Sequence, residues 1–240
     1  MGNIWTLARR ELGNYFFSPI AYLVAFFFLI FTGVFFVFYG PRLEAGMEAT
    51  LAPLFAFMVI VLTLLVPPLT MRLLSEEYRS GTIEMLMTAP ITDVEVVLGK
   101  FLGALLYYVA LLVPTVAYLF ILELYADPDY GPILAGYLGL LLIGALYISV
   151  GTFFSALSRY QIVAAVASIV VLFLFAYIIG QASMETSGPL RVFLQNLSIE
   201  GHYRDFARGV LDTSHIVYFL SGTLFFLFLS VKVVESRKWW

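Results

Sequence analysis

The sequence predicts an all-α membrane protein in which six helices cross the bilayer. Of its 240 residues, 62% are hydrophobic and 12% are charged, and the mean hydropathy is +0.96. Soluble proteins have about 45–50% apolar and about 25% charged residues. Six apolar runs follow one another along the chain, and roughly twenty residues suffice to cross a hydrocarbon core. No polar stretch between them is long enough for a separate core, so we expect one transmembrane domain over residues 1–240.

An amphipathic segment precedes the first apolar run, over residues 3–16. At 100° per residue its apolar side chains fall on one arc, and Arg9 and Arg10 fall on the opposite arc. This pattern is typical of a helix that lies in the membrane interface. Glu11 falls within the apolar arc, where a carboxylate needs a partner such as an arginine from another segment. The alternative is that its side chain snorkels to water.

The six apolar runs are bounded by glycine, proline and charged residues. We predict transmembrane helices over residues 20–39, 53–71, 101–122, 132–157, 161–181 and 216–231. Pro67 and Pro68 near the end of the second run should kink that helix. Small residues four positions apart, such as Gly151 and Ser155, would let neighbouring helices approach closely.

The distribution of basic residues predicts the orientation in the membrane. With six spans both termini lie on one side, and that side would hold nine of the thirteen lysines and arginines. The positive-inside rule therefore places both termini in the cytoplasm. The polar stretch of residues 69–100 would lie on the same side, and the loop of residues 182–214 on the outer side.

The stretch of residues 69–100 is the long polar interruption between apolar runs. It holds five of the sixteen carboxylates, Glu76 and Glu77 among them. We expect the second helix to continue past its prolines into this stretch until Gly81 terminates it, since glycine commonly follows the last residue of a helix. Residues 92–95 match a capping box, which should start the helix that enters the membrane as the third span.

A short helix across the polar stretch is expected over residues 82–88. The residues of this cross-helix and of its boundary are Thr82, Ile83, Glu84, Leu86, Met87 and Pro90. The proline prevents continuation by excluding its predecessor from the α region. The three apolar side chains form a stripe flanked by acids, which fits a groove on a partner protein. The alternative is that the stripe rests on the bilayer or on neighbouring helices.

An external amphipathic helix is predicted over residues 198–211, with a serine as its N-cap. Its candidate functional residues are His202, Tyr203, Arg204 and Phe206. The tyrosine and the phenylalanine lie on the apolar face, and the arginine lies on the polar face. The histidine lies at the edge of the apolar face, where a lone histidine is more often a hydrogen-bonding group than a functional one.

Several function classes are disfavoured by what the sequence lacks. It has no cysteine, no basic block for nucleic acid and no GxxxxGK[ST] sequence for binding ATP. A channel or a secondary transporter would need ionisable groups at membrane depth, and no predicted span has one in its middle. We therefore expect no catalytic, cofactor-binding or metal-binding residue in this chain.

The run MRLLSEEYRSGTIEMLMTAPITDVEVVLGKF, residues 71–101, closely resembles the cytoplasmic signature of ABC-2 type permeases, the membrane subunits of ABC exporters. The amphipathic start with Arg9, Arg10 and Glu11 is similar to the N-terminal interface helix of that family. The segment LSIEGHYRDFARGVLD resembles the external helix of its gliding-motility-type and copper-maturation-type branches.

The resemblance implies that residues 82–88 form a coupling helix seated in a cleft of a separately encoded ATP-binding subunit. Glu76 and Glu77 would lie beside the coupling helix, and Glu11 of the interface helix would contact the same region. ATP and magnesium would bind two copies of the partner subunit. A second copy of this chain or a paralogue would complete the permease in the prokaryotic inner membrane, with an extracytoplasmic accessory subunit as a further partner. The function that the resemblance implies is export driven by ATP hydrolysis in the partner subunit. The alternative is a membrane anchor that transmits mechanical work to partner proteins.

Overall fold

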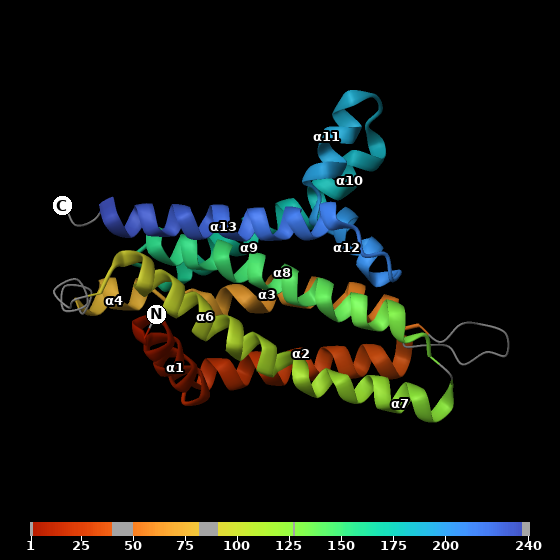
Figure 1. The fold of residues 1–240 in the computed structure, drawn as a ribbon, viewed down its shortest axis with the longest axis horizontal. Coiled ribbons are helices and arrows are strands. Elements are labelled where there is room, and N and C mark those ends of the chain that lie inside the picture. The colour runs from red at the N-terminus through yellow and green to blue at the C-terminus, as the bar shows by residue number, and fades with distance from the viewer. Residues whose placement is uncertain (1, 40–49, 82–90, 127, 237–240) are drawn as a thin grey trace.

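The computed structural model describes residues 2–39, 50–81, 91–126 and 128–236, and helix is the regular secondary structure throughout these ranges (Figure 1). Six helical segments are long and apolar enough to cross a membrane. They are Pro19–Tyr39, Ala52–Ser80, Asp93–Tyr125, Tyr130–Leu157, Gln161–Glu185 and Thr213–Ser236. The predicted fold class, an all-α polytopic membrane protein, is confirmed.

The helices follow one another with short connections. In the first half of the chain they are α1 (Gly2–Phe16), α2 (Pro19–Tyr39), α3 (Ala52–Thr70), α4 (Ser75–Ser80), α6 (Asp93–Leu112) and α7 (Ala117–Tyr125). In the second half they are α8 (Tyr130–Leu157), α9 (Gln161–Phe173), α10 (Ile179–Glu185), α11 (Pro189–Leu197), α12 (Ile199–Ala207) and α13 (Thr213–Ser236). A 3-10 turn (Val113–Val116) joins α6 to α7, and a π-helical segment, η2 (Leu174–Ile178), joins α9 to α10.

The long helices form a bundle with α8 at its centre. In its most apolar stretch 67% of the residues are buried, against 22% in α2 and in α13. Glycines of α8 allow this close packing, because a Cβ built on Gly139 would lie 2.8 Å from the ring of Tyr203 in α12. The outer helices instead expose large apolar side chains such as Val37 and Phe228. In a bundle of membrane-spanning length, that surface faces lipid.

The two ends of the bundle differ in what they carry. The terminal end holds α1, α4 and the C-terminal end of α13, whereas the far end holds α12 and the end of α7 (Figure 1). The hairpin of α10 and α11 projects sideways from the bundle near the far end. The first and last helices of the described chain therefore begin and finish at the same end, as an even number of spans requires.

The sequence predicts that the second span continues as one helix into the polar stretch, but the structure shows a break. The α3 helix ends at Thr70, a turn follows, and α4 begins at Ser75. The N–H groups of Leu74 and Ser75 donate to the hydroxyl of Ser155 in α8 and not to carbonyls one turn back. An inserted side chain of this kind interrupts a helical ladder, and this explains the break.

The outer polar loop also differs from the expectation. The predicted helix over residues 198–211 ends at Ala207, because Gly209 adopts a left-handed φ of +84° shortly afterwards. A further helix, α11, precedes α12, and the sequence pattern does not predict it. Ser198 does cap α12, since its side chain accepts a hydrogen bond from the N–H of Gly201 at 3.3 Å.

Candidate functional site

The first helix is held against α6 by two glycines one helical turn apart. A Cβ built on Gly99 would lie 2.6 Å from the Cβ of Leu7, and one built on Gly103 would lie 2.6 Å from the Cβ of Glu11. The GxxxG spacing lets two helix backbones approach more closely than larger residues allow. This approach brings the carboxylate of Glu11 within 3.6 Å of the Nζ of Lys100, the residue that follows Gly99.

Lys100 is the centre of a buried ion cluster. Its Nζ lies 2.8 Å from Glu77 Oε1 and 3.6 Å from Glu11 Oε2, and its side chain is only 7% exposed. Glu11, Glu77 and Lys100, termed here the Lys100 junction, come from α1, α4 and α6 respectively. Removal of one partner from a buried pair leaves an uncompensated charge and destabilises by about 3–5 kcal/mol. The junction therefore joins three helices that the sequence separates widely.

A polar cavity of about 300 Å³ adjoins the junction, between α1 and the end of α3. Glu11, Arg72 and Glu76 line it. Arg72 Nε and Glu77 Oε2 are buried without a hydrogen-bond partner among the described residues. Side chains of opposite charge therefore line one small cavity at the terminal end of the bundle.

Two tyrosines anchor the C-terminal end of α1. The hydroxyl of Tyr15 donates to the carbonyl of Leu69 at 2.9 Å, and its ring stacks on that of Tyr107 with centroids 5.0 Å apart. The Tyr107 hydroxyl donates to the carbonyl of Ala21 at 2.7 Å. These contacts fasten α1 to the end of α3, to α6 and to the start of α2.

The turn between α3 and α4 is held by Ser155 of α8. Its Oγ accepts from the N–H groups of Leu74 at 2.9 Å and Ser75 at 3.1 Å, and donates to the carbonyl of Met71 at 2.9 Å. Two orphan donors at the start of α4 are thereby satisfied from another helix. The central helix of the bundle thus holds the element that carries Glu77.

The segment between α4 and α6 is bracketed by fixed ends. Gly81 has a left-handed φ of +73° and terminates α4, as predicted. The predicted capping box starts α6: Thr92 Oγ1 accepts from the N–H of Glu95 at 3.2 Å, and Glu95 Oε2 accepts from the N–H of Thr92 at 2.9 Å. The predicted cross-helix residues lie outside the described part of the chain. These are Thr82, Ile83, Glu84, Leu86, Met87 and Pro90.

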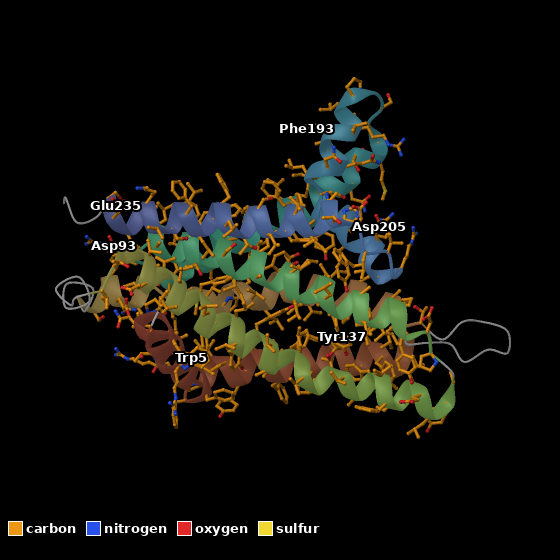
Figure 2. All side chains as sticks on the ribbon, in the orientation of Figure 1. Trp5, Asp93, Tyr137, Phe193, Asp205 and Glu235 are labelled. Atoms are coloured by element: carbon orange, nitrogen blue, oxygen red, sulfur yellow. The ribbon has the colours of Figure 1, made fainter. Side chains whose placement is uncertain are left out.

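The remaining predicted residues fall into two groups that the structure keeps apart. Arg9 and Arg10 are exposed on the outer side of α1, at the terminal end. The predicted residues of the external helix lie in α12, toward the far end. In Figure 2 the labelled residues Trp5 of α1 and Asp205 of α12 mark this separation. Among the described residues, the buried Lys100 junction therefore lies at the terminal end of the bundle and the predicted residues of α12 lie toward the other end.

In α12 the predicted residues have separate structural roles. Tyr203 and Phe206 are buried against α8. His202 stacks on Tyr218 with centroids 4.0 Å apart, and its Nδ1 lies 2.8 Å from the carbonyl oxygen of Ser198. Burial lowers the pKa of His202, so its ring is a neutral packing and hydrogen-bonding group. Arg204 pairs with Glu200 one turn earlier at 3.0 Å.

Comparison with known families decides what kind of membrane protein this is. Residues 42–198 match the family model described as ABC-2 family transporter protein. The chain belongs to the ABC-2 transporter family. It is accordingly a membrane-integral permease subunit of an ABC transporter, whose partner is an ABC ATP-binding subunit. No curated protein sequence matches it.

The part of the ABC-2 permease covered by the family match includes Glu77, Lys100 and Ser155 but not Glu11. The capping box at residues 92–95 predicts that the helix carrying Lys100 enters the membrane, but it does not identify the partners of that lysine. The signal for its role is the GxxxG spacing of Gly99 and Gly103, because it predicts a close helix contact that would bury Lys100. Ser155 gave no such signal, because its partners are backbone groups of a turn that the sequence pattern did not predict.

Proposed function

We propose that this ABC-2 permease couples ATP hydrolysis by a separate ATP-binding subunit to export across the prokaryotic cytoplasmic membrane. The observation that carries the proposal is the Lys100 junction. It links α4 and α6, which flank residues 82–90, to the interface helix α1. If a partner displaced residues 82–90, the ion pairs of Lys100 would transmit the movement to α1, α4 and α6.

The proposed orientation follows from charge. The terminal end would carry nine of the thirteen lysines and arginines and would face the cytoplasm. Residues 82–90 would then form a coupling helix in a cleft of the ATP-binding subunit. Two such subunits would hold ATP and magnesium, and a second permease copy or a paralogue would complete the transporter. The similarity of α12 to the gliding-motility-type and copper-maturation-type branches remains a prediction.

The orientation is tested by cysteine labelling. Because the chain has no native cysteine, only the introduced residue can react. Tyr125→Cys at the far end should react with a membrane-impermeant maleimide from outside intact cells, because that side chain is exposed. Arg79→Cys at the terminal end should react only after the cells are opened. The reverse pattern would overturn the orientation.

The coupling proposal is tested in vesicles that contain the permease and its co-purified ATP-binding subunit. Lys100→Met should abolish most of the permease-dependent stimulation of ATP hydrolysis while the subunits still co-purify. Lys232→Met is the matched control, since that lysine forms an exposed pair with Glu235 at 2.7 Å. Full stimulation by an assembled Lys100→Met complex would show that the junction does not transmit movement. If this variant fails to assemble, Glu77→Gln, which leaves Lys100 paired with Glu11, replaces it.

A further inference from the structure

Two cavities of opposite character adjoin one another at the far end of the bundle. A polar cavity of about 440 Å³ lies between α10, α11 and α12. An apolar cavity of about 200 Å³ lies between α3, η2 and α12. Both are lined by Glu200 and Arg204 of α12 and by Arg208, the residue directly after that helix, which are spaced four residues apart. A single elongated ligand could therefore contact both cavities.

The apolar cavity is shaped by small residues. Ala52 and Ala56 of α3 and Ala176 of η2 line it together with larger apolar side chains. The π-helical turn in η2 departs from the regular helix at this point, and such turns occur frequently at functional sites. The lining is suited to an alkyl chain, whose burial gains about 0.8 kcal/mol per methylene when it leaves water.

The polar cavity has an excess of positive charge. Three arginines and two acids line it. Glu200 is paired with Arg204, and Asp205 lies 2.8 Å from His215 Nε2. The side chains of Arg191 and Arg208 have no hydrogen-bond or ion-pair partner among the residues that the structure describes. Two guanidinium groups thus remain available for an anion.

The placement of these arginines is unusual for the side they occupy. In the proposed orientation the outer side holds four of the thirteen basic residues, and Arg191, Arg204 and Arg208 all line this one cavity. The positive-inside rule disfavours basic residues in short outer loops. A bound anion in the cavity would explain why these three arginines cluster there.

We propose that the two cavities together bind an anionic amphiphile. Its phosphate or carboxylate headgroup contacts Arg191 and Arg208, and its apolar chain occupies the cavity between α3 and η2. Guanidinium groups bind such oxyanions through paired N–H donors. A neutral lipid would leave both arginines without a counter-charge, and a free anion would leave the apolar cavity unused. The excess of arginines on the outer side rests on the proposed orientation, but binding requires neither ATP nor the partner subunit, so lipid retention and ATPase stimulation can fail separately.

The test is native mass spectrometry of the full chain in detergent with equal amounts of phosphatidic acid and phosphatidylcholine of the same acyl chains. We expect the protein to retain phosphatidic acid about tenfold more, as a charge-assisted hydrogen bond predicts. Arg191→Gln with Arg208→Gln should abolish that preference without disturbing a pair inside the protein. Arg9→Gln with Arg10→Gln removes two exposed arginines of α1 and should leave it unchanged.

Two further arms separate the headgroup from the chain. Ala56→Phe should fill the apolar cavity and lower retention of phosphatidic acid, and an excess of inorganic phosphate should not displace the lipid. Equal retention of the two lipids would overturn the proposal. So would a preference that survives loss of Arg191 and Arg208, a preference that Arg9 and Arg10 supply, or complete displacement by inorganic phosphate.

Discussion

The side-chain oxygen of Ser155 accepts a hydrogen bond from the backbone N–H of Leu74, at 2.9 Å, across the interface between α8 and the turn after α3. The same oxygen accepts from Ser75 and donates to the carbonyl of Met71. One hydroxyl thus replaces the helical partners of two consecutive residues. The direction of α4, and with it the position of Glu77, depends on that contact.

Ser155→Ala should destabilise the bundle, because it leaves two buried N–H groups without an acceptor. Each unsatisfied donor costs about 1–3 kcal/mol. The measurement is the free energy of unfolding in detergent. Ser221→Ala is the control, since that exposed serine bonds only to a carbonyl of its own helix. A Ser155→Ala variant as stable as this control would mean that the turn finds its acceptors elsewhere.

Gly103→Ala should separate α1 from α6. The new Cβ would lie 2.6 Å from the Cβ of Glu11 and 3.0 Å from the carbonyl oxygen of Ala8, so the helices must move apart. Overpacking of this kind typically costs about 1–3 kcal/mol. Gly13→Ala meets nothing within 4 Å and should stabilise α1 slightly. Unfolding measurements that rank the two variants in the opposite order would contradict the close approach.

The pair of Lys100 and Glu77 should show strong coupling in a double-mutant cycle of Lys100→Met and Glu77→Gln. The lysine variant alone leaves two partly buried carboxylates without a cation and should lose about 3–5 kcal/mol. The double variant should lose less than the sum of the single ones. The exposed pair of Lys232 and Glu235 should give about 0–1 kcal/mol in the same cycle. Similar coupling for both pairs would argue against a buried junction.

The stability of the far end should fall in mild acid. Burial lowers the pKa of His202 below its ordinary value of 6.5, so the unfolded chain binds the proton more readily than the folded one. The contribution of His202 is complete above the unfolded pKa and declines as the pH falls through it toward the folded pKa. Thermal unfolding at a series of pH values should show this decline, and His202→Gln should reduce it. An unchanged pH dependence in the variant would assign the effect to another group.

Much of the fold could be predicted from the sequence because its signals are local. Hydrophobic runs gave the six spans, Gly81 gave the end of α4, and Thr92 with Glu95 gave the start of α6. The break after Thr70 could not be predicted, because its cause is a side chain from a helix 81 residues away in sequence.

The candidate site was predictable only in part, for a related reason. The position of Glu11 within an apolar arc required a cation from another segment, but the pattern could not identify which one. The partner from another segment is a lysine, Lys100. Its identity follows from the register between α1 and α6, which the contacts of Gly99 and Gly103 determine.

One positive charge serves two carboxylates in the Lys100 junction, at 2.8 Å and 3.6 Å. If α4 moved away from α6, the ammonium group of Lys100 would lose Glu77 but could still pair with Glu11. The buried charge would then keep a counter-charge. The shorter distance marks Glu77 as the nearer partner, and Glu11 provides a second carboxylate within 4 Å of the same ammonium group. Lys100 could change its carboxylate partner in this way while its side chain stays buried.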